Sequence, residues 1–180
     1  MPRWSRPLTP GEIAMARSIF RDAVDYARVR IHDSRYLPFG LQPRHVCMTP
    51  NGHMYFSALC FRHDFSAESV SARHWFMHEM VHVWQHQLGY PVKLRGAIRL
   101  GLSYDYALAP ERRFGDYNME AQGDLLADYF VLRYLTAGSP ERAADLADYE
   151  TVLGDFLADP ADPLHLPGGR KRRARAALAD

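Results

Sequence analysis

The chain has 180 residues, 47% of them hydrophobic, a length and composition that fit one domain with its own core rather than two domains. Lys and Arg number 22 against 21 Asp and Glu, so the formal net charge of +1 gives no general attraction to nucleic acid or to an anionic membrane. Cys47 and Cys60 are too few for a disulfide framework, although they could pair with each other. We expect a single domain over residues 1–167.

The two ends of the chain bear on its location and its partners. Charged side chains interrupt residues 1–20, so no apolar run there resembles the core of a signal peptide, and no other apolar stretch approaches membrane-spanning length. We expect a chain that is made in the cytoplasm, does not contact a membrane and is exported only by a specialised machinery. Residues 168–180 form a tail that begins with a Gly pair and continues with basic residues, a pattern more typical of a disordered terminus than of a nucleic-acid site.

The first part of the chain predicts one helix followed by short strands. Thr9 and Glu12 form a capping box around Pro10, and apolar residues then recur at helical spacing, which predicts a helix over residues 10–28. Segments rich in β-branched and aromatic side chains follow at residues 29–32, 44–48 and 53–61. Because a Pro-Asn-Gly sequence separates the last two segments, we expect them to form a hairpin.

The rest of the chain predicts three helices. Residues 70–88 contain no Gly or Pro and are followed by Gly89, which indicates a central helix. After an irregular stretch, Asp116 is placed to cap a helix over residues 116–135, and a last helix is expected over residues 139–158. The order of helix, small sheet, central helix, loop and two helices is an α+β arrangement.

A short motif on the central helix indicates a metal site. His78 and His82 stand four residues apart, so their Cβ atoms lie on one helix face about 6 Å apart and both imidazoles can bind one ion. Glu79 lies beside them and could reach a metal-bound water. Composition predicts only about 0.02 chance matches to this His-Glu-x-x-His pattern. We therefore predict zinc bound by His78 and His82, with a purely structural histidine pair as the alternative.

A catalytic zinc needs a third protein ligand and an open position for water. His86 continues the spacing but would lie about 12 Å along the axis from His78, and the Gly and His of the longer metzincin signature do not follow His82. Glu120 and Asp124, four residues apart on the next predicted helix, can face one side. Glu120 could then bind zinc while Asp124 orients a histidine ligand. The alternative for both is a solvated helix face.

The motif His78-Glu79-x-x-His82, followed by Glu120-x-x-x-Asp124, resembles the gluzincin pattern of zinc metallopeptidases. The resemblance implies a zincin-like fold, in which a small, mostly antiparallel sheet packs on the central zinc-binding helix and further helices follow. It also implies that Glu120 is the third zinc ligand and that Asp124 contacts a histidine ligand.

Residues 76–85 are also similar to short bacterial domains associated with Rhs and Vgr proteins of type VI secretion, and the similarity extends more loosely over residues 31–65. It implies a secreted effector or a processing peptidase, with a secretion-system protein as a partner. In zincins generally an edge strand holds the peptide, and residues 52–56 could supply that edge. One departure is Gly123, which weakens the predicted ligand helix by about 1 kcal/mol relative to Ala, or else allows a close backbone approach.

We expect a zinc-dependent hydrolase, and a peptidase in particular, that acts on a peptide or protein, cell-wall peptide included. Glu79 would take the proton of a zinc-activated water and deliver it to the leaving amine. Tyr104, Tyr106 and Tyr117 are candidate donors to the transition state, and ordinary packing is the alternative for each. A structural-zinc or pseudo-enzyme adaptor domain and a nucleic-acid-binding tail are the competing functions.

Overall fold

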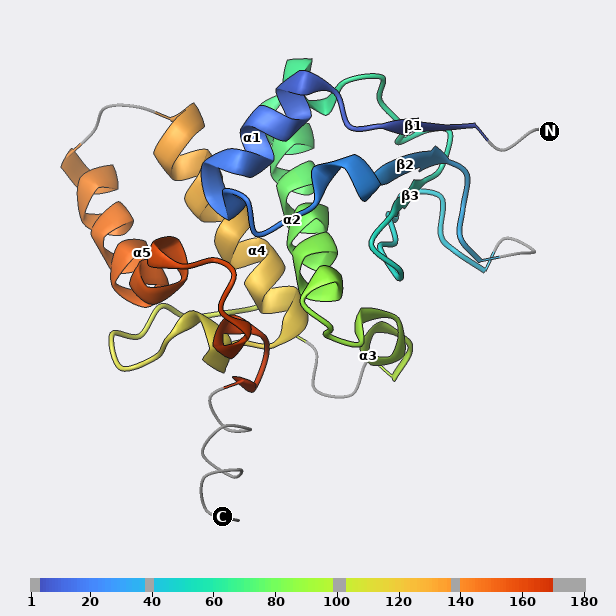
Figure 1. Cartoon of the computed structure of the whole chain (residues 1–180). Coiled ribbons are helices and arrows are strands. Elements are labelled where there is room, and N and C mark those ends of the chain that lie inside the picture. Colours follow the sequence, from blue (N-terminus) through green and yellow to red (C-terminus); the bar gives the residue numbers. More distant parts are fainter. Residues whose placement is uncertain (1–3, 38–40, 99–102, 137–139, 170–180) are drawn as a thin grey trace, which may run out of the picture.

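The computed structural model describes residues 4–37, 41–98, 103–136 and 140–169. These residues form an α+β fold, as predicted, in which a small sheet lies beside a group of helices (Figure 1). The strands are β1 (Ser5–Pro7), β2 (Arg30–Asp33) and β3 (Met54–Phe56). The α-helices are α1 (Pro10–Phe20), α2 (Val70–Gln87), α3 (Val92–Ile98), α4 (Met119–Phe130) and α5 (Pro140–Ala158). The shorter helical turns are η1 (Tyr26–Arg28), η3 (Phe65–Ala67), η4 (Phe114–Asp116), the π-helical η5 (Val131–Leu135) and η6 (Pro163–His165).

The central helix matches its prediction closely. α2 begins after Ser69, whose hydroxyl accepts a hydrogen bond from the backbone N–H of Ala72, and it ends at Gln87. Gly89 then adopts a φ of +87°, a left-handed conformation that glycine allows and that stops the helix. Residues 76–85 are all buried, because other elements lie on both sides of α2 (Figure 1). The candidate metal ligands of this helix therefore lie inside the fold.

The first helix is shorter than predicted. α1 begins with the predicted capping box, in which Thr9 and Glu12 exchange hydrogen bonds, but it ends at Phe20. Arg21 takes a φ of +49°, and the hydroxyl of buried Tyr26 donates to the carbonyl of Arg21 at 2.6 Å. This contact holds a turn in the middle of the predicted helix, and helical periodicity alone does not reveal it.

The sheet differs from the predicted one. β1 pairs antiparallel with β2, and β2 pairs parallel with β3, so the sheet is mixed rather than mostly antiparallel. The predicted hairpin is reduced to one antiparallel bridge, in which Met48 and Tyr55 exchange backbone hydrogen bonds of 2.9 and 3.3 Å. β3 is the last strand of the sheet, and the bridge to Met48 covers its outer side at Tyr55, so the edge expected over residues 52–56 is not free at that residue. Strand β1 was not predicted, because its Ser-Arg-Pro sequence has neither apolar alternation nor high strand propensity.

The second half of the chain contains a helix that the sequence did not predict. α3 lies in the stretch expected to be irregular. α4 is capped by Asn118, whose side chain accepts the N–H of Glu120, whereas Asp116 accepts the N–H of Arg113 and closes the turn η4. The helical course continues through η5 to Leu135, the predicted end, and α5 ends as predicted.

Three further predictions concern the cysteines, the membrane and the tail. Cys47 and Cys60 are both buried and unpaired. Among the described residues, no helix combines the length and apolar character needed to span a bilayer. The predicted basic tail lies outside the described residues from residue 170 onwards.

Candidate metal centre

The helices α2 and α4 pack side by side (Figure 1). Their contact places histidines of α2 opposite carboxylates of α4. The two helices run antiparallel, so a residue four positions earlier in α2 lies opposite a residue four positions later in α4. The pairs are His82 with Glu120 at 3.2 Å, His78 with Asp124 at 2.7 Å and His74 with Asp128 at 2.8 Å. The antiparallel register of two regular helices thus brings together all four of the metal and orienting residues that the sequence singled out.

The ligand atoms of three predicted residues form a small triangle. Nε2 of His78 and Nε2 of His82 lie 3.1 Å apart, and Oε2 of Glu120 is 3.3 Å from the first and 3.2 Å from the second. Two ligands at about 2.0–2.1 Å from a tetrahedral zinc ion are about 3.4 Å apart, so these atoms already have nearly the required spacing. Within the described part of the chain, these are the only three His, Cys or acidic residues whose ligand atoms lie this close together. The residues present therefore fit zinc.

Each histidine is oriented by a partner at its other ring nitrogen. Nδ1 of His78 lies 2.7 Å from Asp124, and Nδ1 of His82 lies 2.9 Å from Oε1 of Gln85. The Nε2 atom of Gln85 in turn donates to Gln122 at 2.9 Å. Such partners fix the tautomer and turn the remaining nitrogen towards the metal position. Sequence reasoning missed Gln85, although its place three residues after His82 on one helix face was a usable signal.

The charges at the triangle favour a bound cation. Burial alone would lower the pKa of His78, but hydrogen bonds with Asp124 and Glu120 raise it to about 10. Burial would raise the pKa of Glu120, but hydrogen bonds from His78 and His82 hold it well below its usual range. The carboxylates that stabilise a proton here would also stabilise a divalent metal ion, which takes the proton's place when histidine becomes a ligand.

Gly123 lies where α4 comes close to the site. A Cβ atom at this position would be 2.6 Å from Cε1 of His78 and 2.7 Å from its Nδ1, far inside van der Waals contact. Of the two expectations for Gly123, the close backbone approach is confirmed. The helix remains continuous there, because Leu125 and Leu126 are fully buried and hold α4 in the core.

Glu79 is held from the other side of the fold. The hydroxyl of Thr49 donates to Oε2 of Glu79 at 2.5 Å, and both residues are buried. Thr49 follows Met48, whose bridge to Tyr55 joins this segment to β3. No pattern in the sequence pairs Thr49 with Glu79, because the two residues are 30 positions apart and belong to different elements.

A pocket of about 380 Å³ opens beside the triangle and contains Glu79 in its wall. Much of the remaining wall is apolar, with contributions from α3, α4 and the segment around Met48. The apolar side chains are those of Leu37, Leu41, Pro43, Val46, Met48, Pro50, Val92, Ala97 and Met119. A mostly apolar cleft with a few convergent polar groups is the usual form of a small-ligand or substrate site.

The three predicted tyrosines lie at different places. Tyr104 is 55% exposed, lines this pocket and stacks on His78 with ring centroids 6.2 Å apart. Tyr106 donates its hydroxyl to Asp128 at 2.5 Å, and Tyr117 donates its hydroxyl to a backbone carbonyl at 2.9 Å. Of the three, Tyr104 alone lines the pocket next to the ligand triangle, so it is the candidate donor that we retain.

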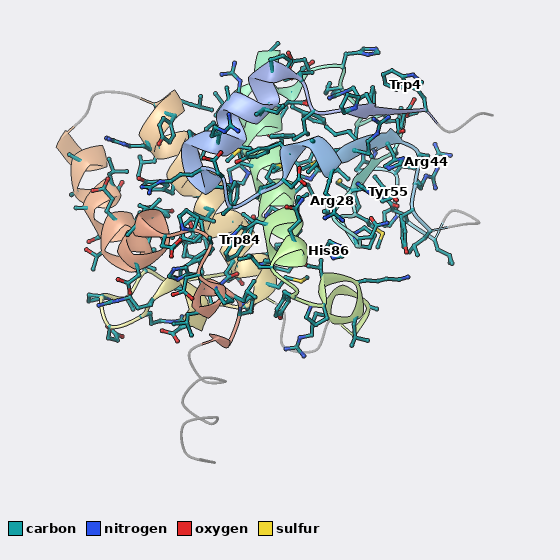
Figure 2. The ribbon with its side chains drawn as sticks, viewed as in Figure 1. Trp4, Arg28, Arg44, Tyr55, Trp84 and His86 are labelled. Atoms are coloured by element: carbon teal, nitrogen blue, oxygen red, sulfur yellow. The ribbon has the colours of Figure 1, made fainter. Side chains whose placement is uncertain are left out.

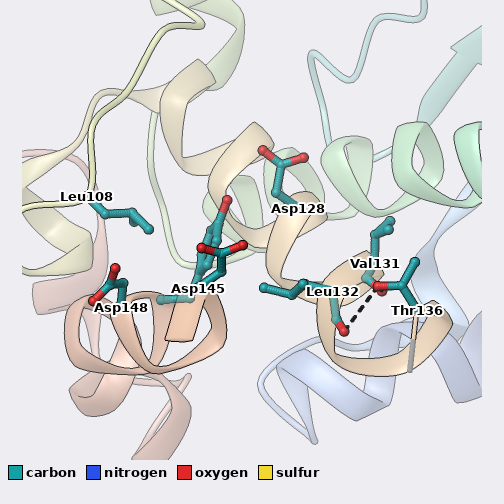
Figure 3. A pocket seen from close by; sticks show the side chains of 8 residues that line it. Leu108, Asp128, Val131, Leu132, Thr136, Asp145 and Asp148 are labelled. Atoms are coloured by element: carbon teal, nitrogen blue, oxygen red, sulfur yellow. Dashed lines mark hydrogen bonds between the residues drawn. The ribbon is translucent and has the colours of Figure 1, made fainter. Parts of the chain in front are cut away.

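Asp128 also borders a separate acidic pocket of about 420 Å³, in which Asp145 and Asp148 of α5 face α4 (Figure 3). Burial alone would raise the pKa of Asp128, but hydrogen bonds from His74 and Tyr106 lower it. The carboxylate is thus engaged by two protein groups. Its contact with Tyr106 ties the loop that includes Tyr104 to α4.

These features define an α+β protein with a candidate His, His, Glu metal centre, and comparisons with known proteins assign it to a family. No family model matches the sequence. The chain is 44% identical over 133 residues to the type VI secretion system spike protein VgrG2b of Pseudomonas aeruginosa, a match that covers 70% of this chain and 13% of the spike protein. The solved effector domain of Pseudomonas aeruginosa VgrG2b superposes with a TM-score of 0.65 at 39% identity, covering 84% of this chain and 81% of that domain. The chain therefore belongs to the family of the VgrG2b effector domain.

Proposed function

We propose that this chain is a zinc-dependent hydrolase, and a peptidase in particular, with a zincin-like fold. The observation that supports it best is the triangle of ligand atoms from His78, His82 and Glu120 beside the buried carboxylate of Glu79. Structural zinc sites usually close with a fourth protein ligand, whereas catalytic sites leave that position open. In the described residues no fourth His, Cys or acidic ligand joins the triangle, which favours a hydrolase over a structural-zinc or adaptor domain.

The proposed mechanism gives each residue of the site a separate task. Zinc bound by the triangle would supply Lewis-acid chemistry, polarising a water and the scissile carbonyl. Glu79 would accept the proton of the attacking water on its carboxylate and deliver it to the leaving amine. Thr49, which donates to this carboxylate, would hold it in position. Tyr104 would donate to the negative charge that develops on the carbonyl oxygen.

We propose that the substrate peptide binds along residues 47–49. Met48 uses its N–H and its carbonyl to pair with Tyr55, so the backbone groups of Cys47 and Thr49 point to the opposite side. All three residues line the pocket beside the triangle. An extended peptide could add there as a further strand, and the apolar wall would take an apolar side chain.

The relation to VgrG2b supports a role in type VI secretion. The chain spans only 13% of the matched spike protein, and the matched solved structure is an effector domain. We propose that this chain acts as an effector domain that is made in the cytoplasm and exported with a secretion-system protein as its partner. Its substrate would be a peptide or protein, cell-wall peptide included.

Metal analysis is the direct test of this function. The purified chain should contain about one zinc ion per molecule, because one three-ligand site is present. Zinc-loaded protein should then cleave members of an unbiased peptide library or cell-wall fragments, and a chelator should abolish the cleavage. A folded chain that stays metal-free after zinc addition would contradict the proposal.

A further inference from the structure

A separate pocket lies at the C-terminal end of α2, one helical turn beyond His82. It encloses about 380 Å³ and is lined by Arg28, Asn51, Gly52, His53, His86 and Gln87. Arg28 and His86 lie near each other between α2 and the strands (Figure 2). The lining includes one arginine and two histidines but no acidic residue, so Arg28 is the one permanently charged side chain of this lining.

The neighbouring side chains affect the protonation of His53. Burial, and after it the nearby His86 and two arginines, lower the pKa of His53. The Nδ1 atom of His53 is shielded from water and has no hydrogen-bond partner among the described residues. An anion bound in the pocket would oppose the effect of the neighbouring side chains on His53 and would favour its protonated form.

Two donor side chains of the pocket are free to bind a ligand. Neither Arg28 nor His86 makes a side-chain hydrogen bond or ion pair with another residue in the described ranges. The two amides of the lining have structural contacts instead. Gln87 bonds to the backbone of Asp25 at 2.8 and 3.2 Å, and Asn51 donates to the hydroxyl of Tyr55 at 3.2 Å. The two amides therefore hold the wall of the pocket together, while the side chains of Arg28 and His86 remain available to a ligand.

Gly52 gives the pocket its shape. Its φ is +78°, and a Cβ atom there would lie 2.7 Å from Cδ2 of His86. The backbone before β3 can therefore lie directly against the imidazole of His86, which keeps the two histidines of the pocket near each other.

We propose that this pocket binds a phosphate group, either as inorganic phosphate or within a small phosphomonoester. The guanidinium of Arg28 presents a fork of N–H donors that matches phosphate oxygens, and the imidazoles of His53 and His86 in the same lining can each add an N–H donor. A tetrahedral dianion can accept bonds from several directions at once, whereas a carboxylate accepts them in one plane. The volume leaves room for a small ester group. This site is separate from the metal triangle and does not require hydrolase activity.

The test is a titration of the full chain with inorganic phosphate and with glycerol phosphate at constant ionic strength, followed by the histidine ring signals in NMR spectra. We expect saturable shifts of the His53 and His86 signals. Arg28→Gln should weaken binding by about tenfold or more, because a charge-assisted contact is lost. The control is Arg44→Gln, which removes an exposed arginine outside the pocket (Figure 2). This variant should bind phosphate as tightly as the wild type does.

Tighter binding of glycerol phosphate than of inorganic phosphate would identify the ester as the preferred ligand form. His86→Gln provides a second variant with the same expected weakening, so the test does not depend on the stability of one substitution. The absence of saturable shifts, equal weakening by Arg44→Gln, or equally tight binding of acetate would each overturn the proposal.

Discussion

The helix pair α2–α4 and the segment at residues 47–56 form two sides of the candidate site, and they are built differently. The helix pair positions its side chains through one register between two regular elements, which aligns three histidine–carboxylate pairs in succession. The segment depends on isolated contacts, chiefly the bridge between Met48 and Tyr55 and the bond from Thr49 to Glu79. We infer that the helix pair determines metal binding, whereas the segment affects how well bound metal is used.

Substitutions in the two regions should therefore have different effects. Changes on the helix pair should alter zinc affinity, because its side chains either bind the metal or orient its ligands. Changes on the segment should leave zinc bound and lower turnover. Glu79 lies on α2 of the helix pair, but its carboxylate accepts a hydrogen bond from Thr49 of the segment.

Glu79→Gln should have the largest effect on hydrolysis. The amide keeps the shape of the side chain but cannot accept the proton of the attacking water, so we expect a 10²- to 10⁴-fold loss, about the usual contribution of general-base catalysis. Zinc content should remain at the wild-type level. The measurement is paired metal analysis and peptide cleavage, and cleavage at the wild-type rate with zinc bound would remove Glu79 from the mechanism.

Glu120→Ala should reduce zinc affinity the most among the variants of the helix pair. It removes one corner of the ligand triangle, so its loss should exceed the roughly 10- to 100-fold expected for Asp124→Asn, which only disturbs the orientation of His78. His86→Ala is the control, because His86 borders a different pocket. Competition with a fluorescent zinc chelator measures all three variants. A larger loss in the control than in Glu120→Ala would refute the ligand assignment.

Gly123→Ala should weaken both folding and zinc binding. The new methyl group would press on the ring of His78, at a cost of about 1–3 kcal/mol for overpacking. Because the methyl group would lie 2.6 Å from Cε1 of His78, we expect the upper part of this range, which exceeds the gain of about 1 kcal/mol that alanine brings to a helix. Gly154→Ala in α5 is the matched control, since nothing lies within 4 Å of its Cβ position, and it should stabilise the chain by up to about 1 kcal/mol. Thermal unfolding of both variants tests the difference in sign.

Thr49→Val should have the smallest effect and should act on turnover. Loss of one hydrogen bond to a charged group corresponds to about 1.5–3 kcal/mol at most, so kcat should fall by about tenfold while zinc content and KM stay near their wild-type values. Thr49→Ser retains the hydroxyl and should restore most of the activity. If Thr49→Ser and Thr49→Val lower kcat equally, the hydrogen bond to Glu79 has no role in positioning the carboxylate.

The candidate site was predictable to the extent that it depends on helices. The His78 and His82 pair follows from the spacing within α2, and the spacing of Glu120 and Asp124 follows in the same way within α4. That these two pairs meet is a tertiary fact, which the resemblance to gluzincins implied and which spacing alone left open. Gly123 shows the same division, because its propensity cost was readable from the sequence, whereas its contact with His78 was not.

The sequence by itself determined where the central helix begins and ends and which of its residues share a face. Helix propensity and helix termination are local interactions, so the uninterrupted run over residues 70–88 and the Gly89 that follows it predict α2 without help from the rest of the chain. Only the tertiary structure decided the end of α1, the mixed order of the sheet and the contact of Thr49 with Glu79. These features arise from pairings between distant residues, and neither strand register nor a single side-chain hydrogen bond leaves a periodic pattern in the sequence.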